Sequence, residues 1–157
     1  MTGQPVPIWF NHINQSGTAV GGVTEAAGDV AVRWSALGGL TYYPSVPPVT
    51  SDAWNINARG DATVYLVSYR HIGADSLWEG NTAVWLANGQ IAQLGTLGGT
   101  HTFANGISDV GLVGGHSQFG SNTGPQHAVF WDLNSPDVNA RKRAQPVMSR
   151  GKTRRLP

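Results

Sequence analysis

The sequence predicts an all-β repeat protein, and three observations support this prediction. The composition has 21 glycines, 9 prolines and only 12% charged residues, which is typical of many short strands joined by tight turns. A short phrase of Ile, Asn or Ser, two variable residues and Gly recurs three times, with its glycines 43 and then 51 residues apart. Apolar and β-branched runs flank each copy. At this spacing each copy indicates one supersecondary unit stacked against its neighbours.

The repeated phrase is predicted to be a hairpin turn. It occupies residues 13–17, 56–60 and 107–111. An Asn side chain can bond the backbone two residues further on, and Gly adopts the positive φ of a tight turn without steric cost. We therefore expect a scaffold role, rather than ligand binding, for Asn14, Gly17, Asn57, Gly60 and Gly111.

Strands are predicted on both sides of each turn. A short apolar first strand precedes it, at Trp9-Phe10, Ala53-Trp54 and Phe103-Ala104. A second strand follows it, over residues 18–22, 61–69 and 112–115. A third strand carries an Ala-Val pair and a bulky residue, over residues 31–34, 83–86 and 128–131, and is expected to be buried.

A final strand is predicted over residues 39–43 in the first copy and 90–99 in the second, whereas the pattern is lost after Asp132 in the third. In the third strand, Trp34 and Trp131 hold the same repeat position, which predicts that both belong to the core. Residues 24–29, 70–81 and 118–126 are predicted to be loops of variable length and therefore the places where a ligand binds.

Four short strands in about 45 residues match one blade of a β-propeller. The prediction is a repeat domain over residues 1–136, with units at about 9–50, 51–101 and 102–136, and a basic tail over residues 137–157. A closed propeller normally needs at least four blades. Three units therefore suggest a fragment, an open array, or closure through self-association.

Several of these segments resemble the HAF repeat of probable extracellular bacterial repeat proteins. The resemblance is carried by residues 83–86, 89–99, 104–108 and 111–115, and the Leu-Gly-Thr-Leu-Gly-Gly run at 94–99 is its most specific element. His127-Ala128-Val129-Phe130 resembles the His-Ala-Phe triplet that names the family. The likeness covers about Trp9 to Trp131, and departs from the pattern at 42–44 and 61–63 and in the missing last strand.

The resemblance implies a propeller-like protein of secreted or surface-associated type, with no catalytic residues to carry over. Residues 1–10 show neither a basic leader nor an apolar core of a signal peptide. No stretch approaches the roughly 18 apolar residues of a membrane span. We expect a soluble chain without its own export signal, placed outside the cell by resemblance alone.

Charge divides the chain into two parts. Residues 1–140 hold three arginines against nine acidic residues, a balance of −6, whereas residues 141–157 hold seven basic residues and no acid, a balance of +7. Such a tail is expected to be disordered. It could be an electrostatic arm for nucleic acid or anionic lipid, but a solvated terminus is the favoured interpretation, and we do not expect nucleic-acid binding.

Catalytic and metal chemistry finds little support in the motifs. There are no cysteines, and the five histidines show neither a His-Glu-x-x-His run nor a calcium loop, so no metal and no cofactor is expected. His116 and Ser117 lie in a segment that only approaches the Gly-x-Ser-x-Gly elbow of hydrolases. Glu79 is a conceivable carboxylate for glycoside cleavage. A secreted glycoside or ester hydrolase on a propeller scaffold remains the alternative.

The favoured function is a non-catalytic binding or structural module for an unknown protein or carbohydrate ligand. Exposed aromatic side chains offer contact area together with a polar edge. The tryptophans near turns and insertions, with an aromatic and a histidine of the third copy, are the binding candidates: Trp9, Trp54, Trp78, His116 and Phe119.

Overall fold

The computed structural model describes residues 6–44, 49–72, 75–121, 123–135, 143–144 and 147–148. The side chains of residues 69–72, 75–78, 143–144 and 147–148 lie outside this description. Every regular element in the described part of the chain is a β-strand. The prediction of an all-β fold is therefore confirmed.

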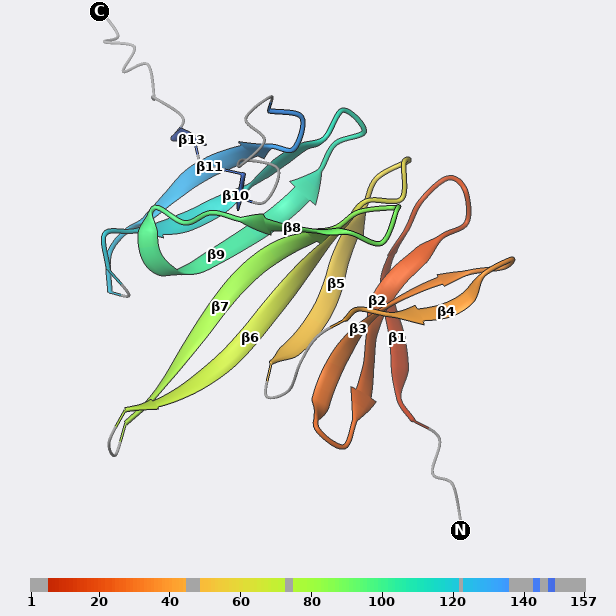
Figure 1. Ribbon diagram of the computed structural model, residues 1–157, viewed down its shortest axis with the longest axis horizontal. Helices are drawn as coiled ribbons and strands as arrows, with labels where there is room; N and C mark the ends of the chain where they lie inside the picture. The colour runs from red at the N-terminus through yellow and green to blue at the C-terminus, as the bar shows by residue number, and fades with distance from the viewer. Residues whose placement is uncertain are drawn as a thin grey trace, which may run out of the picture.

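The strands form three antiparallel meanders that follow one another along the chain, as Figure 1 shows. Unit 1 contains β1 (Ile8–Ile13), β2 (Ala19–Glu25), β3 (Gly28–Ser35) and β4 (Gly39–Tyr42). Unit 2 contains β5 (Thr50–Ile56), β6 (Ala62–Ile72), β7 (Asp75–Trp85) and β8 (Ile91–Leu94). Unit 3 contains β9 (Gly98–Ile107), β10 (Leu112–Phe119) and β11 (Gln126–Asp132).

These meanders make two sheets. Unit 1 is a sheet of its own, whereas units 2 and 3 share a nine-stranded sheet because β7 and β9 run parallel at one pair, Gly80 opposite His101. The described residues close neither a barrel nor a propeller. Three separate four-stranded blades are thus not what the structure shows. In the described part of unit 3 the place beside β11, which corresponds to that of β4 and β8 in the other units, is held by two residues of the tail.

Two short strands come from the basic tail, which was predicted to be disordered. β12 (Arg143–Ala144) pairs parallel with β8, and β13 (Val147–Met148) pairs antiparallel with β11. The other residues of 137–157 lie outside the described residues. At these two places, then, the tail adds strands to the sheet.

The repeated phrase forms the predicted turns. Gly17, Gly60 and Gly111 have φ of 76°, 91° and 84°, the left-handed region that favours glycine. In each turn the glycine N–H donates to the carbonyl of the Asn or Ser three residues earlier, at 3.0 to 3.1 Å. The Asn14 Oδ1 also accepts a bond from the Ser16 N–H at 3.1 Å. The scaffold role predicted from turn chemistry therefore agrees with the geometry.

The same asparagines also join one turn to the next. The Asn14 Nδ2 donates to the Asn57 carbonyl at 2.9 Å, and the Asn57 Nδ2 donates to the Ser108 carbonyl at 3.0 Å. These partners lie 43 and 51 residues apart, which are the two repeat spacings. The repeated asparagine thus closes its own turn through its oxygen and binds the following turn through its nitrogen.

A second recurring bond lies in the interior between units. The Ser51 Oγ accepts the Ala31 N–H at 2.9 Å, and the Thr102 Oγ1 accepts the Thr82 N–H at 3.0 Å. Both hydroxyls belong to the first strand of a unit, and both bond the third strand of the preceding unit. Both also lie six residues before the Asn or Ser of the following turn (Asn14, Asn57 or Ser108), which we call the repeated turn residue. A buried polar link is therefore repeated at each boundary between units.

Removing this hydroxyl should destabilise the protein. Thr102 is 1% exposed, and Thr102→Val keeps its shape but leaves the buried Thr82 N–H without its acceptor. We expect a loss of about 2 kcal/mol in the free energy of unfolding, measured by urea denaturation. Thr102→Ser retains the hydroxyl and is the matched control. Equal stability of the valine and serine variants would contradict the assigned role.

The hydrophobic core lies between the units and not inside any one of them. One cluster joins unit 1 to unit 2 and another joins unit 2 to unit 3. In the first, the Tyr43 ring meets the Trp85 ring edge to face at 5.7 Å, and burial raises the pKa of Tyr43 to about 12. In the second, Val84 of unit 2 packs with Val113 and Trp131 of unit 3. Each unit therefore needs a neighbour to bury its face.

Arg33 strengthens the first boundary. Its Nη2 donates to the Trp85 carbonyl at 2.9 Å, and its guanidinium lies 4.2 Å from the centroid of the Trp85 ring. Burial lowers the pKa of Arg33, and the nearby charge of Asp61 acts in the opposite direction. The side chain thus reaches from the third strand of unit 1 onto the core tryptophan of unit 2.

Each first strand carries a β-bulge at the same place. Asn11, Trp54 and Asn105 are the unpaired extra residues, and each lies three residues before its repeated turn residue. Beside the bulge, β10 carries Gly115 because a Cβ there would overlap the Phe103 carbonyl oxygen. Gly21 stands in the same relation to the Trp9 carbonyl. Gly21 and Gly115 therefore allow a close backbone approach beside the bulge, whereas Gly114 has open space for a Cβ and Val64 holds the position of Gly21 and Gly115 in unit 2.

The tryptophans of the third strands hold one register position, but their burial differs. Trp34, Trp85 and Trp131 each pair with the residue five positions after the repeated turn residue. Trp85 and Trp131 are 2% and 0% exposed, whereas Trp34 is 39% exposed. The prediction that Trp34 is core is wrong, because units 1 and 2 cover the other two and no preceding unit lies over unit 1 in the described chain.

The predicted loops are mostly strand. Residues 70–81 belong to the long hairpin of β6 and β7, apart from residues 73–74, which lie outside the described part. Residues 24–29 contain only the tight turn between β2 and β3, and residues 118–126 keep a true connection between β10 and β11. In the described part of the chain, residues 24–29 and 70–81 are therefore not long loops.

Candidate functional site

The first strands of the three units bring one set of repeat positions onto a shared surface. Trp9, Asp52 and Phe103 each lie five residues before the repeated turn residue, on β1, β5 and β9. Their cross-strand partners are Gly22, Tyr65 and His116. Since β1 contacts β5 and β5 contacts β9, these pairs follow one another from unit to unit.

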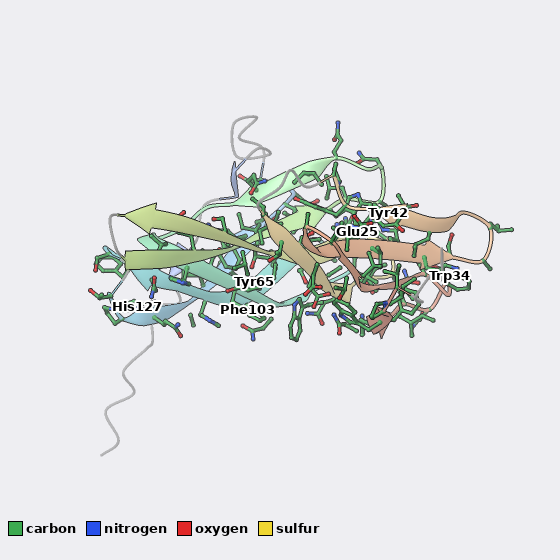
Figure 2. All side chains as sticks on the ribbon, turned by 90° about the horizontal axis from the view of Figure 1, so that it is seen from below. Glu25, Trp34, Tyr42, Tyr65, Phe103 and His127 are labelled. Atoms are coloured by element: carbon green, nitrogen blue, oxygen red, sulfur yellow. The ribbon has the colours of Figure 1, made fainter. Side chains whose placement is uncertain are left out.

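Phe103 is the centre of an aromatic group formed by two units. Its ring centroid lies 5.1 Å from Tyr65 and 5.7 Å from both Trp54 and His116. The first two contacts are edge to face, and the imidazole is stacked on the phenyl ring at 21°. Figure 2 shows Tyr65 and Phe103 on the same side of the molecule. We call Trp54, Tyr65, Phe103 and His116 the aromatic row.

The row is open to solvent along its length. Trp54 stands on the bulge of β5 and is 44% exposed, and the other three side chains are half-buried. Burial raises the pKa of Tyr65, and its phenol can both donate and accept hydrogen bonds. Contacts between the rings fix their orientation, and the exposed part of the Trp54 side chain suits stacking on a flat apolar ligand.

A polar group continues the surface toward unit 1. The Asn11 Nδ2 donates to both carboxylate oxygens of Asp52, at 3.1 and 3.2 Å, and to the Ala53 carbonyl at 2.8 Å. Burial raises the pKa of Asp52, and hydrogen bonds from Asn11 and Trp9 partly offset that rise. The Trp9 ring lies against Gly22, where a Cβ would overlap it. Packing on Gly22 leaves Trp9 half-buried, and its hydrogen bond helps to orient the Asp52 carboxylate.

The structure unites two of the five predicted binding residues. Trp54 and His116 meet through Phe103, and Trp9 supports the polar end of the same surface. Phe119 lies elsewhere, 49% exposed and 5.6 Å from the ring of His127. The side chain of Trp78 is outside the described residues.

Four members of this surface were missed from the sequence, and one of them, Asn11, shares the bulge position of Trp54, three residues before the turn. Asp52 and Phe103 share the repeat position of Trp9, five residues before the turn, and Tyr65 shares that of His116, eight residues after it. Counting from the repeated turn would have found them. Residue type alone could not have found them, because the same repeat position carries chemically different residues in the three units.

The residues of the hydrolase alternative are not arranged as a catalytic pair. Ser117 is 0% exposed, and its Oγ accepts the Leu97 N–H at 3.0 Å. Adjacent residues of a strand point to opposite faces, so His116 faces the aromatic row while Ser117 faces the interior. The Ser117 hydroxyl is thus a buried link between β10 and the connection from β8 to β9.

A separate groove of about 390 Å³ borders the hairpin of β2 and β3. Glu25, Asp29 and Tyr42 are among its lining residues, and the Thr24 Oγ1 donates to the Asp29 Oδ1 at 2.8 Å. Figure 2 shows Tyr42 on the opposite side of the molecule from Phe103. Of the three predicted ligand loops, residues 24–29 are the one that meets this hollow.

Comparisons with family models, curated proteins and solved structures find no match for this chain. Within the described residues, no helix is long and apolar enough to cross a membrane. In the same part of the chain, no three His, Asp or Glu side chains gather as metal ligands would. The aromatic row is thus the surface on which a functional conclusion can be built.

Proposed function

We propose that this chain is a non-catalytic binding module that holds a carbohydrate along the aromatic row. The observation that supports it is the alignment of four rings from β5, β6, β9 and β10 around Phe103, beside the fixed carboxylate and amide of Asp52 and Asn11. Aromatic faces take the apolar faces of sugar rings, and planar side chains bond their hydroxyls.

The form of the surface favours an extended polymer over a small molecule. Small-molecule sites are concave and enclose most of their ligand. The row consists of one exposed and three half-buried side chains, and it crosses the boundary between units 2 and 3. Residues from both sides of that boundary would then contact successive sugars of one chain.

We further propose that the three units are propeller-like blades of the HAF type, in an extracellular or surface-associated bacterial protein. Support comes from the four-strand meander of units 1 and 2, from the repeated turns, and from contact between successive first strands. In that arrangement β1, β5 and β9 would lie nearest the propeller axis, and the aromatic row would face the opening where ligands reach a propeller.

Substitution of the row should weaken binding without unfolding the protein. Affinity electrophoresis in gels containing soluble polysaccharides, such as β-glucans, xylans and mannans, identifies the ligand, and calorimetry then measures its Kd. We expect Trp54→Ala and Phe103→Ala each to raise Kd at least about fivefold, since stacking on a ring is worth on the order of 1 kcal/mol or more.

Tyr42→Ala is the matched control, because Tyr42 is 48% exposed and lies on the other side of the molecule. It should leave Kd unchanged. Failure to bind any polysaccharide, or an equal loss in the control, would refute the proposal. If the row binds a protein and no saccharide, the site is correct and the ligand is a protein instead of a carbohydrate.

A further inference from the structure

Unit 1 exposes on its outer face three side chains whose repeat positions form the core elsewhere. Phe10, Ile13 and Trp34 are 48%, 60% and 39% exposed. The same positions in unit 2 are Ala53 and Ile56, counted from the turn, and Trp85, matched by its cross-strand partner; they are 0%, 3% and 2% exposed and pack against unit 1. In unit 3 they are Ala104, Ile107 and Trp131, which pack against unit 2.

This outer face is apolar over neighbouring strands. The rings of Phe10 on β1 and Trp34 on β3 are 6.5 Å apart. Phe10 and Trp34 hold in unit 1 the positions that Ala53 and Trp85 hold in unit 2, and in unit 2 these positions face unit 1. The face therefore has the chemistry of a surface between units, and it is bare in the described chain.

Unit 3 exposes the complementary half. The third-strand position that contacts the following unit is Arg33 in unit 1, which covers Trp85, and Val84 in unit 2, which is 0% exposed. In unit 3 the position is Phe130, which is 41% exposed. Its cross-strand partner Gly114 faces open space, since a Cβ there would meet no atom within 4 Å.

We infer that the outer face of unit 1 binds the outer face of unit 3 in a second copy of this chain, head to tail. The argument is continuity, because the same pair of faces already meets twice within the chain, between units 1 and 2 and between units 2 and 3. Such a heterologous contact forms a ring when its rotation closes. Two copies hold six units, within the range of four to eight blades of closed propellers.

The ladder of turns predicts the polar part of this contact. Each preceding turn donates a side-chain N–H to the carbonyl of the next turn, so residue 108 of one copy would face the Asn14 carbonyl of the other. Ser108 has no amide, and its Oγ already accepts the Leu112 N–H at 3.0 Å. Ser108→Asn would restore the nitrogen that Asn14 and Asn57 use and should tighten association about fivefold.

The experiment measures mass by sedimentation velocity over a range of concentrations. The wild-type chain should associate, and Trp34→Asp and Phe130→Asp should each weaken association at least about tenfold, because each buries a charge at the contact. Circular dichroism checks that both variants stay folded. Phe119→Asp is the matched control, since Phe119 is 49% exposed in unit 3 and pairs with His127 outside the proposed contact.

Mixing the two variants tests the direction of the contact. Trp34→Asp retains an intact unit 3 face and Phe130→Asp retains an intact unit 1 face, so an equal mixture should form a 1:1 dimer that neither forms alone. A mixture that stays monomeric would overturn the inference. So would a wild-type chain that stays monomeric at millimolar concentration, or association lost with Trp34→Asp but kept with Phe130→Asp, which indicates a symmetric contact between two unit 1 faces.

Discussion

Replacing Gly115 by alanine is expected to lower the free energy of unfolding by about 3 kcal/mol, the upper part of the range for overpacked sites. A Cβ at this position would overlap the carbonyl oxygen of Phe103 and come within 3.0 Å of its carbonyl carbon. These are backbone atoms, so no rotation of a side chain relieves the overlap. Relief requires β9 to move away from β10, which would also displace the Phe103 ring. Urea denaturation measures the loss.

The adjacent glycine provides the control. A Cβ added at Gly114 would meet nothing within 4 Å, so Gly114→Ala should change stability by less than about 0.5 kcal/mol. Gly21→Ala should behave like Gly115→Ala, because the Trp9 carbonyl stands in the same place in unit 1. Similar stabilities for the Gly114 and Gly115 variants would show that the bulge does not need this close approach.

Replacing Asn57 by alanine should cost a similar amount, about 3 kcal/mol. The side chain is 3% exposed; its Oδ1 accepts the Asp61 N–H at 2.9 Å, and its Nδ2 donates to the Ser108 carbonyl at 3.0 Å and to Asp61 Oδ2 at 3.1 Å. Alanine removes all three bonds and leaves the buried Asp61 N–H without this acceptor. Buried groups left unpaired cost about 1 to 3 kcal/mol beyond the bonds themselves.

Asn14→Ala is the variant to compare with Asn57→Ala. Asn14 holds the equivalent position in unit 1 and, like Asn57, donates to the following turn, but it is only half-buried, so water can replace part of what alanine removes. Asn14→Ala should therefore cost about 1 kcal/mol. Thermal denaturation followed by circular dichroism would rank the two variants. The reverse ranking, or no loss for Asn57→Ala, would contradict the ladder of turns as a stabilising element.

The all-β class and the turns could be predicted because their causes are local. Gly17, Gly60 and Gly111 adopt a backbone conformation that their own sequence favours. The hairpin of β6 and β7 was missed over residues 70–81 because charged residues and glycines there look like a loop, although cross-strand pairing continues through the described residues of this segment.

The surface could be predicted only in part, because it depends on register. Aligning the units by their Ala-Val pairs makes Leu86 the equivalent of Trp34. The cross-strand register instead makes Trp85 the equivalent of Trp34. Loop lengths differ between units, so a third-strand residue is located by its cross-strand partner and not by counting along the chain. Burial is equally non-local, since Trp34 and Trp131 differ only in whether another unit covers them.

The side-chain ladder between the turns also has a consequence for cooperativity. Because each asparagine couples only to the next turn, the stability of the chain should be close to a sum of three local terms and two nearest-neighbour couplings. The middle unit takes part in both couplings and each terminal unit in one. Amide hydrogen exchange should therefore be slowest in β5 to β7 and should quicken toward both ends, so that the array opens from its ends inward.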